Sequence, residues 1–196
     1  MSSVAKIKRK VFPPHLEVKG GYPLSGVLKV SGAKNSSLVL MTAALLTKET
    51  LIINNVPQLT DIDVMSKILR NLGAKLTKST NSLEINSESI FNAELPYQLV
   101  HSLRASFFCI GPLLARLGEA KIPLPGGCNI GARPVDEHIN GLKALGAYVE
   151  INNDVVRAQV SNKNKRLRGA NITLKYPSVG ATETILMASC LALGKT

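Results

Sequence analysis

Two copies of one helix-and-stop pattern decide the fold of this chain: Asp63-Val-Met-Ser-Lys-Ile-Leu-Arg-Asn-Leu-Gly-Ala74 and, about 70 residues later, Asp136-Glu-His-Ile-Asn-Gly-Leu-Lys-Ala-Leu-Gly-Ala147. Both stretches end in Leu-Gly-Ala, in which the glycine is typical of a helix stop before a strand. Self-similarity at a fixed period indicates a repeat architecture. The chain is therefore predicted to contain copies of one structural unit.

A second match supports this interpretation. Residues 34–50 align with residues 104–120 as helices that end in a turn, and a third copy starts near residue 178 and breaks off after one helix. The repeat units are expected at about 22–90, 91–165 and, incomplete, 166–196.

Each unit is predicted to run strand, helix, strand, helix, strand, strand. In the first copy the elements are expected at 27–30, 34–47, 51–53, 61–71, 74–77 and 83–85. In the second copy they are expected at 103–117, near 122, and at 135–145, 148–151 and 155–160. Helices such as 36–46 are apolar nearly all round, which favours burial on most faces. We expect an α/β fold with helices inside and sheets outside.

Composition limits the possible classes of protein. The 196 residues carry a net charge of +11 and are 45% hydrophobic but only 4% aromatic, which predicts an aliphatic core. Three widely spaced cysteines argue against a disulfide framework and fit a reducing compartment. Charged residues interrupt every apolar stretch, so no membrane span is expected. Basic runs at 6–10 and 163–168 favour a solvated tail and loop over nucleic-acid binding, because aromatic stacking residues are scarce.

Three single cations stand at predicted helix starts. Lys34 and Arg104 occupy the same position in the first two copies, and Arg133 precedes the second helix of the second copy. A cation beside a helix N-terminus is suited to phosphate or carboxylate, because the unpaired N–H groups and the helix dipole add to its charge. Each one alone is equally well explained as an exposed cation. Together they favour an anion-binding cleft.

The most reactive thiol is predicted at Cys128, in the loop Leu124-Pro-Gly-Gly-Cys-Asn-Ile-Gly-Ala-Arg-Pro134. A nearby arginine and helix start would both lower the pKa of this thiol. Cys109 and Cys190 lie in apolar helical runs, and we expect both to be buried.

These motifs resemble a known family. Ser31-Gly-Ala-Lys-Asn35, Leu103-Arg-Ala-Ser106, the Cys128 loop and Pro177-Ser-Val-Gly-Ala-Thr182 are similar to the UDP-N-acetylglucosamine 1-carboxyvinyltransferases, enolpyruvyl transferases that open peptidoglycan synthesis. The resemblance implies inside-out α/β barrels of βαβαββ repeats. It also implies a basic tail at 1–17, a segment of a discontinuous first domain at 18–33, and most of a second domain at 34–196.

The resemblance also implies roles for particular residues. Transfer of the enolpyruvyl group of phosphoenolpyruvate to the sugar 3-hydroxyl would use Cys128 as the proton donor, which can be trapped covalently and is the target of fosfomycin. Phosphoenolpyruvate would be bound by Lys34, Asn35 and Arg133. UDP-N-acetylglucosamine would be bound by Arg104, Arg133, Pro134, Val135, Asp136, Glu137, Tyr176, Pro177, Ser178 and Val179.

The resemblance further implies a cytoplasmic enzyme with two small-molecule substrates and no cofactor or metal, nucleic acid or membrane. His138 is expected to have a surface or capping role. Val39 replaces the usual proline of the family. Its members are about twice as long, and their second half completes the first domain and the site. The alternative is therefore a truncated, noncatalytic chain that keeps a half site for a UDP-sugar or another anion, with loose, exposed apolar residues near 18 and 27.

Overall fold

The computed structural model describes residues 15–125, 134–162 and 165–196. The chain divides into two compact units, residues 1–30 and 31–196. All the helices and strands found in the described residues belong to the second unit. None of the helices in this part of the chain is both long and apolar enough to cross a membrane.

Two three-stranded antiparallel sheets repeat one topology. The first contains β1 (Thr50–Asn54), β2 (Lys75–Lys78) and β3 (Ser82–Asn86) in the order β1-β3-β2. The second contains β4 (Glu119–Pro123), β5 (Tyr148–Asn152) and β6 (Val155–Gln159) in the order β4-β6-β5. The registers also correspond, because Thr50 pairs with Asn86 as Glu119 pairs with Gln159. The predicted repeat is thus confirmed by its strand pairing.

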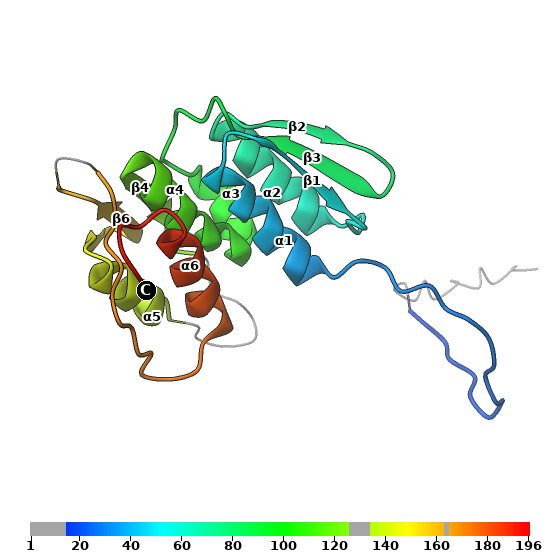
Figure 1. Ribbon diagram of the computed structural model, residues 1–196. Helices are drawn as coiled ribbons and strands as arrows, with labels where there is room; N and C mark the ends of the chain where they lie inside the picture. The colour runs from blue at the N-terminus through cyan, green and yellow to red at the C-terminus, as the bar shows by residue number, and fades with distance from the viewer. Residues whose placement is uncertain (1–14, 126–133, 163–164) are drawn as a thin grey trace, which may run out of the picture. The chain divides into compact units, whose positions relative to one another are not determined.

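The helices of the second unit are α1 (Lys34–Ala43), α2 (Thr60–Asn71), α3 (Tyr97–Ser102), α4 (Ile110–Leu117), α5 (Asp136–Ala144) and α6 (Val179–Ser189), with 3-10 turns η1 (Ala44–Leu46) and η2 (Arg104–Cys109). Helix α6 packs on α4 and α5, and α1 packs on α2. In Figure 1 helices α1 to α4 and α6 lie between the two sheets.

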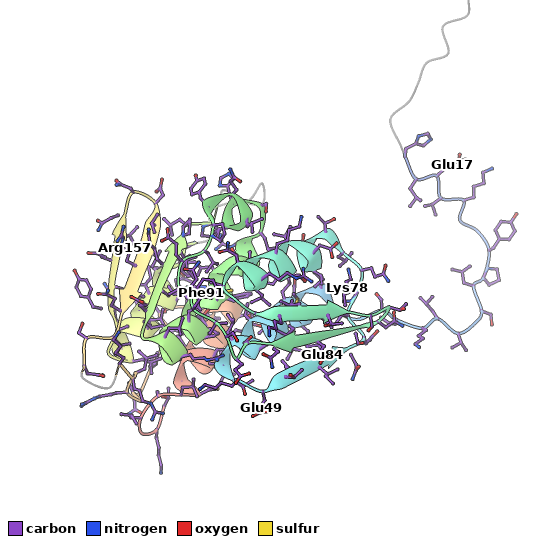
Figure 2. All side chains as sticks on the ribbon, turned by 90° about the horizontal axis from the view of Figure 1, so that it is seen from above. Glu17, Glu49, Lys78, Glu84, Phe91 and Arg157 are labelled. Atoms are coloured by element: carbon purple, nitrogen blue, oxygen red, sulfur yellow. The ribbon has the colours of Figure 1, made fainter. Side chains whose placement is uncertain are left out.

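Each sheet buries the face that it turns to the helices. On β3, Leu83 and Ile85 are buried while Glu84 between them is exposed, and β6 alternates in the same way. Exposed side chains such as Glu84 and Arg157 mark the outer faces (Figure 2). Alternation of this kind is what a sheet with one wet face requires. The helices are therefore inside and the sheets outside, as expected.

The glycines of the two Leu-Gly-Ala stops adopt the left-handed conformation, with φ +105° at Gly73 and +89° at Gly146. After α2 the Ala74 N–H donates to the Leu69 carbonyl at 3.0 Å, and the equivalent bond closes α5 at the same length. This is the Schellman pattern, in which a residue without Cβ turns the chain out of the helix. Both predicted helix stops are confirmed.

The structure differs from the predicted elements in several places. The helix expected at 103–117 is divided into η2 and α4, and α3 was not predicted. Residues 27–30 form no strand, and the apolar side chains near 18 and 27 are exposed as expected. The first strands of the later repeats are reduced to single parallel bridges, Glu94 to Lys121 and Arg168 to Leu193.

Candidate active site

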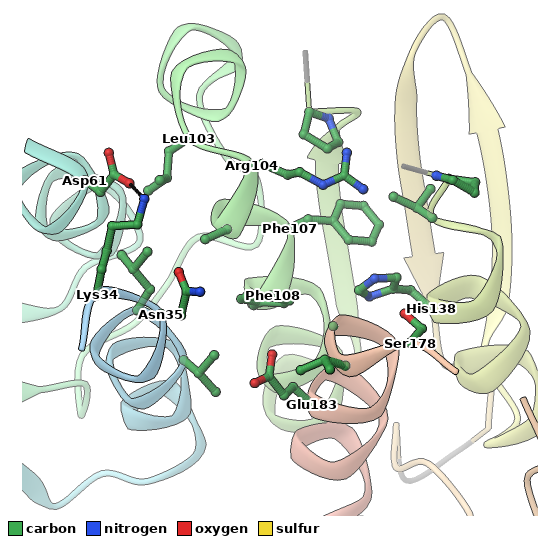
Figure 3. A pocket seen from close by; sticks show the side chains of 18 of the residues that line it. Lys34, Asn35, Asp61, Leu103, Arg104, Phe107, Phe108, His138, Ser178 and Glu183 are labelled. Carbon is green, nitrogen blue, oxygen red and sulfur yellow. Dashed lines mark ion pairs between the residues drawn. The ribbon is translucent and has the colours of Figure 1, made fainter. Parts of the chain in front are cut away.

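A pocket of about 720 Å³ opens in the second unit where the starts of five helical segments meet. Its described walls come from the beginnings of α1 and α2 in the first repeat, of η2 and α5 in the second, and of α6 in the third (Figure 3). The volume is in the range of small-molecule sites. Repetition of the unit has therefore brought equivalent chain positions to one place.

Most of the predicted binding residues in the described part of the chain line this pocket. They are Lys34, Asn35, Arg104, Pro134, Val135, Tyr176, Ser178 and Val179. Cys128 and Arg133 lie outside the described residues. The structure thus brings together cations that are 70 positions apart in the sequence.

The helix starts around the pocket are suited to anions. No side chain forms a capping hydrogen bond at the start of α1, α2 or α5 in the described structure, whereas at α6 the Ser178 hydroxyl accepts from the Ala181 N–H at 3.3 Å. Uncapped N–H groups and the positive end of the helix dipole attract negative charge. The pocket therefore offers backbone donors as well as side-chain cations.

Lys34 is paired within the pocket. Its Nζ lies 2.8 Å from the Asp61 Oδ2, and both side chains are partly exposed. Asp61 is in the first turn of α2 and also lines the pocket. Any anion that binds at Lys34 has to share this ammonium with Asp61 or displace the carboxylate.

Tyr176, Asp136 and Glu137 also contact protein groups in the structure. The Tyr176 hydroxyl donates to the Asp136 Oδ1 at 2.6 Å, which lowers the pKa of Asp136 and raises that of Tyr176 to about 12. Glu137 is buried, and its Oε2 accepts from the Lys175 N–H at 2.7 Å. Asp136 and Glu137 thereby tie the start of α5 to the segment that precedes α6.

The expected surface or capping role of His138 is wrong. Its ring is only 7% exposed and lines the pocket, edge-on to Phe107 and stacked on Phe108. Burial, followed by the positive charge of Arg104, lowers the pKa of His138 to about 4. The imidazole is consequently neutral at physiological pH.

The cysteine predictions have mixed outcomes. Cys109 is buried, as expected, and desolvation raises the pKa of its thiol to about 12. Cys190 is exposed, so its predicted burial is wrong. Cys190 follows α6 on the same side as the exposed Leu186. In the described structure no other element covers this side of the apolar helix.

Two acidic residues of the pocket were missed. The sequence could have identified Asp61, because the repeat alignment places it at the position equivalent to Pro134, which is a predicted binding residue. Glu183, on α6, had none, because its place in the pocket depends on how α6 packs. Burial raises the pKa of Glu183. The described walls therefore carry carboxylates as well as cations.

The repeats, the outer sheets and the pocket define an α/β repeat protein with a pocket where its helix starts meet. The chain belongs to the EPSP synthase (3-phosphoshikimate 1-carboxyvinyltransferase) family, whose model matches residues 18–196. Among solved structures, the enolpyruvyl transferase NikO of Streptomyces tendae matches 88% of this chain and 40% of its own with a TM-score of 0.72 at 22% identity. EPSP synthase of Acinetobacter baumannii matches 85% of this chain and 38% of its own with a TM-score of 0.64 at 17% identity. These structures establish the enolpyruvyl transferase fold.

Sequence relatives are much closer. A protein of Prochlorococcus marinus strain NATL2A named UDP-N-acetylglucosamine 1-carboxyvinyltransferase is 85% identical over all 196 residues, which cover 43% of its length. A protein of the same name from Synechococcus strain CC9605 is 56% identical over 99% of this chain and 45% of its own. The chain thus spans less than half the length of these curated relatives.

Proposed function

We propose that the pocket is one wall of a site for transfer of the enolpyruvyl group of phosphoenolpyruvate to the 3-hydroxyl of UDP-N-acetylglucosamine. The observation that carries the proposal is that Lys34 and Arg104, at equivalent positions of two repeats, line one pocket with uncapped helix starts. The names of the relatives support the choice of substrates.

In this proposal Lys34 and Asn35 hold phosphoenolpyruvate, with Arg133 beside them. The UDP-sugar lies along Arg104, the stretch 133–137 and the stretch 176–179. Two hydrogen bonds hold this wall of the site together. The Tyr176 hydroxyl donates to Asp136, and the Lys175 N–H donates to Glu137.

The chemistry needs fixed positive charge and one acid. The sugar hydroxyl gives its proton to a base as its oxygen attacks the carbon that bears the phosphate ester, and the neighbouring methylene carbon gains a proton and becomes a methyl group. Loss of phosphate together with one proton of that methyl group then restores the double bond. Positive charge develops next to a carboxylate and a phosphate, so cations that hold both anions keep the reacting carbon in place. Cys128 is proposed as the proton donor and as the thiol alkylated by fosfomycin. No cofactor takes part in this scheme.

The second candidate is a noncatalytic half site that binds the UDP-sugar or another anion. The mixed charge of the described walls favours it, since Asp61 and Glu183 offset part of the positive charge. Catalysis requires every charged group around the transition state to be in position, whereas binding of one anion does not.

Phosphate release from phosphoenolpyruvate in the presence of UDP-N-acetylglucosamine separates the two candidates, with calorimetric titration of each compound alongside. Release that depends on the UDP-sugar supports the transferase. Binding of the UDP-sugar without release supports the half site. If neither compound binds and no phosphate appears, the proposed function is wrong.

Three narrower proposals accompany it. The division of the chain into 1–17, 18–33 and 34–196 is retained, although the compact units meet at residue 30. The protein is proposed to act in the cytoplasm, in peptidoglycan synthesis. Further chain, beyond the length matched here, is proposed to supply the opposite wall.

A further inference from the structure

His138 is held by a residue that the sequence did not connect with it. The Nδ1 of its ring lies 2.9 Å from the Thr184 Oγ1, across the contact between α5 and α6. Thr184 is fully buried. Within the described residues, this ring nitrogen is the hydrogen-bond partner of the threonine hydroxyl.

The burial of Thr184 decides which atom donates. If Nδ1 carried the proton, the threonine O–H would be left without an acceptor in the core, and an unpaired buried donor is costly. If the hydroxyl donates to Nδ1, every buried hydrogen is paired. The neutral ring then carries its proton on Nε2.

The Nε2 edge is open to the pocket. His138 lines the pocket, and no described residue forms a hydrogen bond with Nε2. The glycine at position 180 keeps the edge uncovered, because a Cβ there would lie 3.3 Å from Nε2 and 3.1 Å from the Phe108 ring. Figure 3 shows the ring between Phe107, Phe108 and Ser178. A ligand atom can therefore reach this nitrogen.

The charges around the ring favour a neutral donor. Arg104 lines the same pocket and opposes protonation of the ring, whereas Asp136 on α5 favours it. Lys34, Asp61, Tyr176 and Glu183 also line the pocket. Burial outweighs the acidic groups, so the pKa of His138 stays near 4.

We infer that His138 is a binding residue, a neutral imidazole that donates its Nε2–H to an anionic oxygen of the ligand and is held in this tautomer by Thr184. The inference rests on the proposed function for the nature of the ligand. A neutral donor binds a phosphoryl or carboxylate oxygen without adding a charge that would have to be neutralised when the pocket is empty.

The tautomer is tested directly by nitrogen NMR of the ¹⁵N-labelled chain at about pH 7. The expected spectrum shows a protonated Nε2 and an unprotonated, hydrogen-bonded Nδ1 for His138. A protonated Nδ1, or an imidazolium, would overturn the inference whether or not a ligand binds.

Sulfate is the ligand probe, because it keeps its double charge across the pH range used. His138→Phe combined with Thr184→Val removes the donor and its buried partner together, and we expect the sulfate dissociation constant to rise about five- to tenfold. His138→Gln keeps an N–H donor, so the increase should stay below about threefold. His101→Gln is the matched control on α3, and its thermal midpoint and affinity should equal those of the wild type.

The pH profile separates a neutral donor from a cationic one. Sulfate affinity of the wild type should change with pH between about 5.5 and 8 no more than that of His138→Gln. If the folded double variant binds sulfate as tightly as the wild type, the inferred role of His138 is wrong, whereas the proposed function still stands. If the wild type binds neither sulfate nor inorganic phosphate, the proposed function fails as well.

Discussion

The Lys34 ammonium and the Asp61 carboxylate form an ion pair of 2.8 Å at the edge of the pocket, between the first turns of α1 and α2. A second pair of the same length joins Lys78 to Asp63, two residues further along α2. Only the first of these two pairs lines the pocket. Asp61 and Asp63 are therefore a matched pair of residues. Both are aspartates of α2 that pair with a lysine, but only Asp61 lines the pocket.

Asp61→Asn should strengthen anion binding at Lys34. The carboxylate competes with the ligand for the same ammonium, and an exposed pair of this kind corresponds to about two- to fivefold in the sulfate dissociation constant. Asp63→Asn is the control and should leave sulfate affinity unchanged. Weaker sulfate binding in Asp61→Asn would mean that Asp61 orients Lys34 for the ligand and does not compete with it.

The contacts of α6 with its neighbours should tolerate no added methyl group. A Cβ at Gly111 would lie 2.5 Å from the Thr184 carbonyl oxygen, and one at Gly141 would overlap the Ile185 side chain. Each alanine variant should lose about 1–3 kcal/mol in the free energy of unfolding by urea. Adding Ile185→Ala should improve Gly141→Ala and not Gly111→Ala, because only the first clash is with a side chain. Equal effects of Ile185→Ala on both variants would show that the packing differs from that described.

Tyr176→Phe should change stability only within a window of pH. The hydrogen bond lowers the pKa of Asp136, so its contribution is present above the ordinary aspartate pKa of about 3.9 and is lost as pH falls through the lowered value. The same bond raises the pKa of Tyr176 to about 12, so this contribution is fully present below the ordinary tyrosine pKa of about 10 and is lost as pH rises from there through about 12. Urea denaturation should show that the wild type is more stable than the variant between these limits and that the two are equally stable in strong acid. A difference that persists in strong acid would assign the effect to packing of the ring.

The three thiols should differ in reactivity. Cys109 should resist alkylation in the folded chain, because burial raises the pKa of its thiol to about 12 and excludes the reagent. Cys190 is exposed and should react with iodoacetamide. In Cys190→Ser, peptide mass spectrometry after fosfomycin treatment should find the adduct on Cys128. An adduct on Cys109, or none on Cys128 under conditions in which iodoacetamide labels it, would contradict the proposed role of that loop.

The sequence predicted what is local and periodic. The Leu-Gly-Ala stops mark Gly73 and Gly146 because a left-handed residue after an amphipathic helix has a short-range signature. The alignment of Lys34 with Arg104 likewise predicted that equivalent helix starts would gather cations, and both line the pocket.

What the sequence missed depends on partners far along the chain. His138 looks like a polar residue on an amphipathic helix, but Phe107 and Phe108 of η2 and Thr184 of α6, all distant in the sequence, cover it. Cys190 ends an apolar helix that is exposed on one side. Residues 27–30 have the composition of a strand but find no partner strand in the described structure. Propensity is overridden in each case by what packs against the segment.

The most direct test of the anion pocket is the affinity of UDP-N-acetylglucosamine for the 196-residue chain with Arg104→Ala, compared with Arg157→Ala on the outer face of the second sheet. Both changes remove one positive charge, but only Arg104 lines the pocket. We predict that calorimetry finds at least about tenfold weaker binding for Arg104→Ala and no change for Arg157→Ala. Equal affinities of the two variants would mean that Arg104 does not bind the UDP-sugar in this pocket.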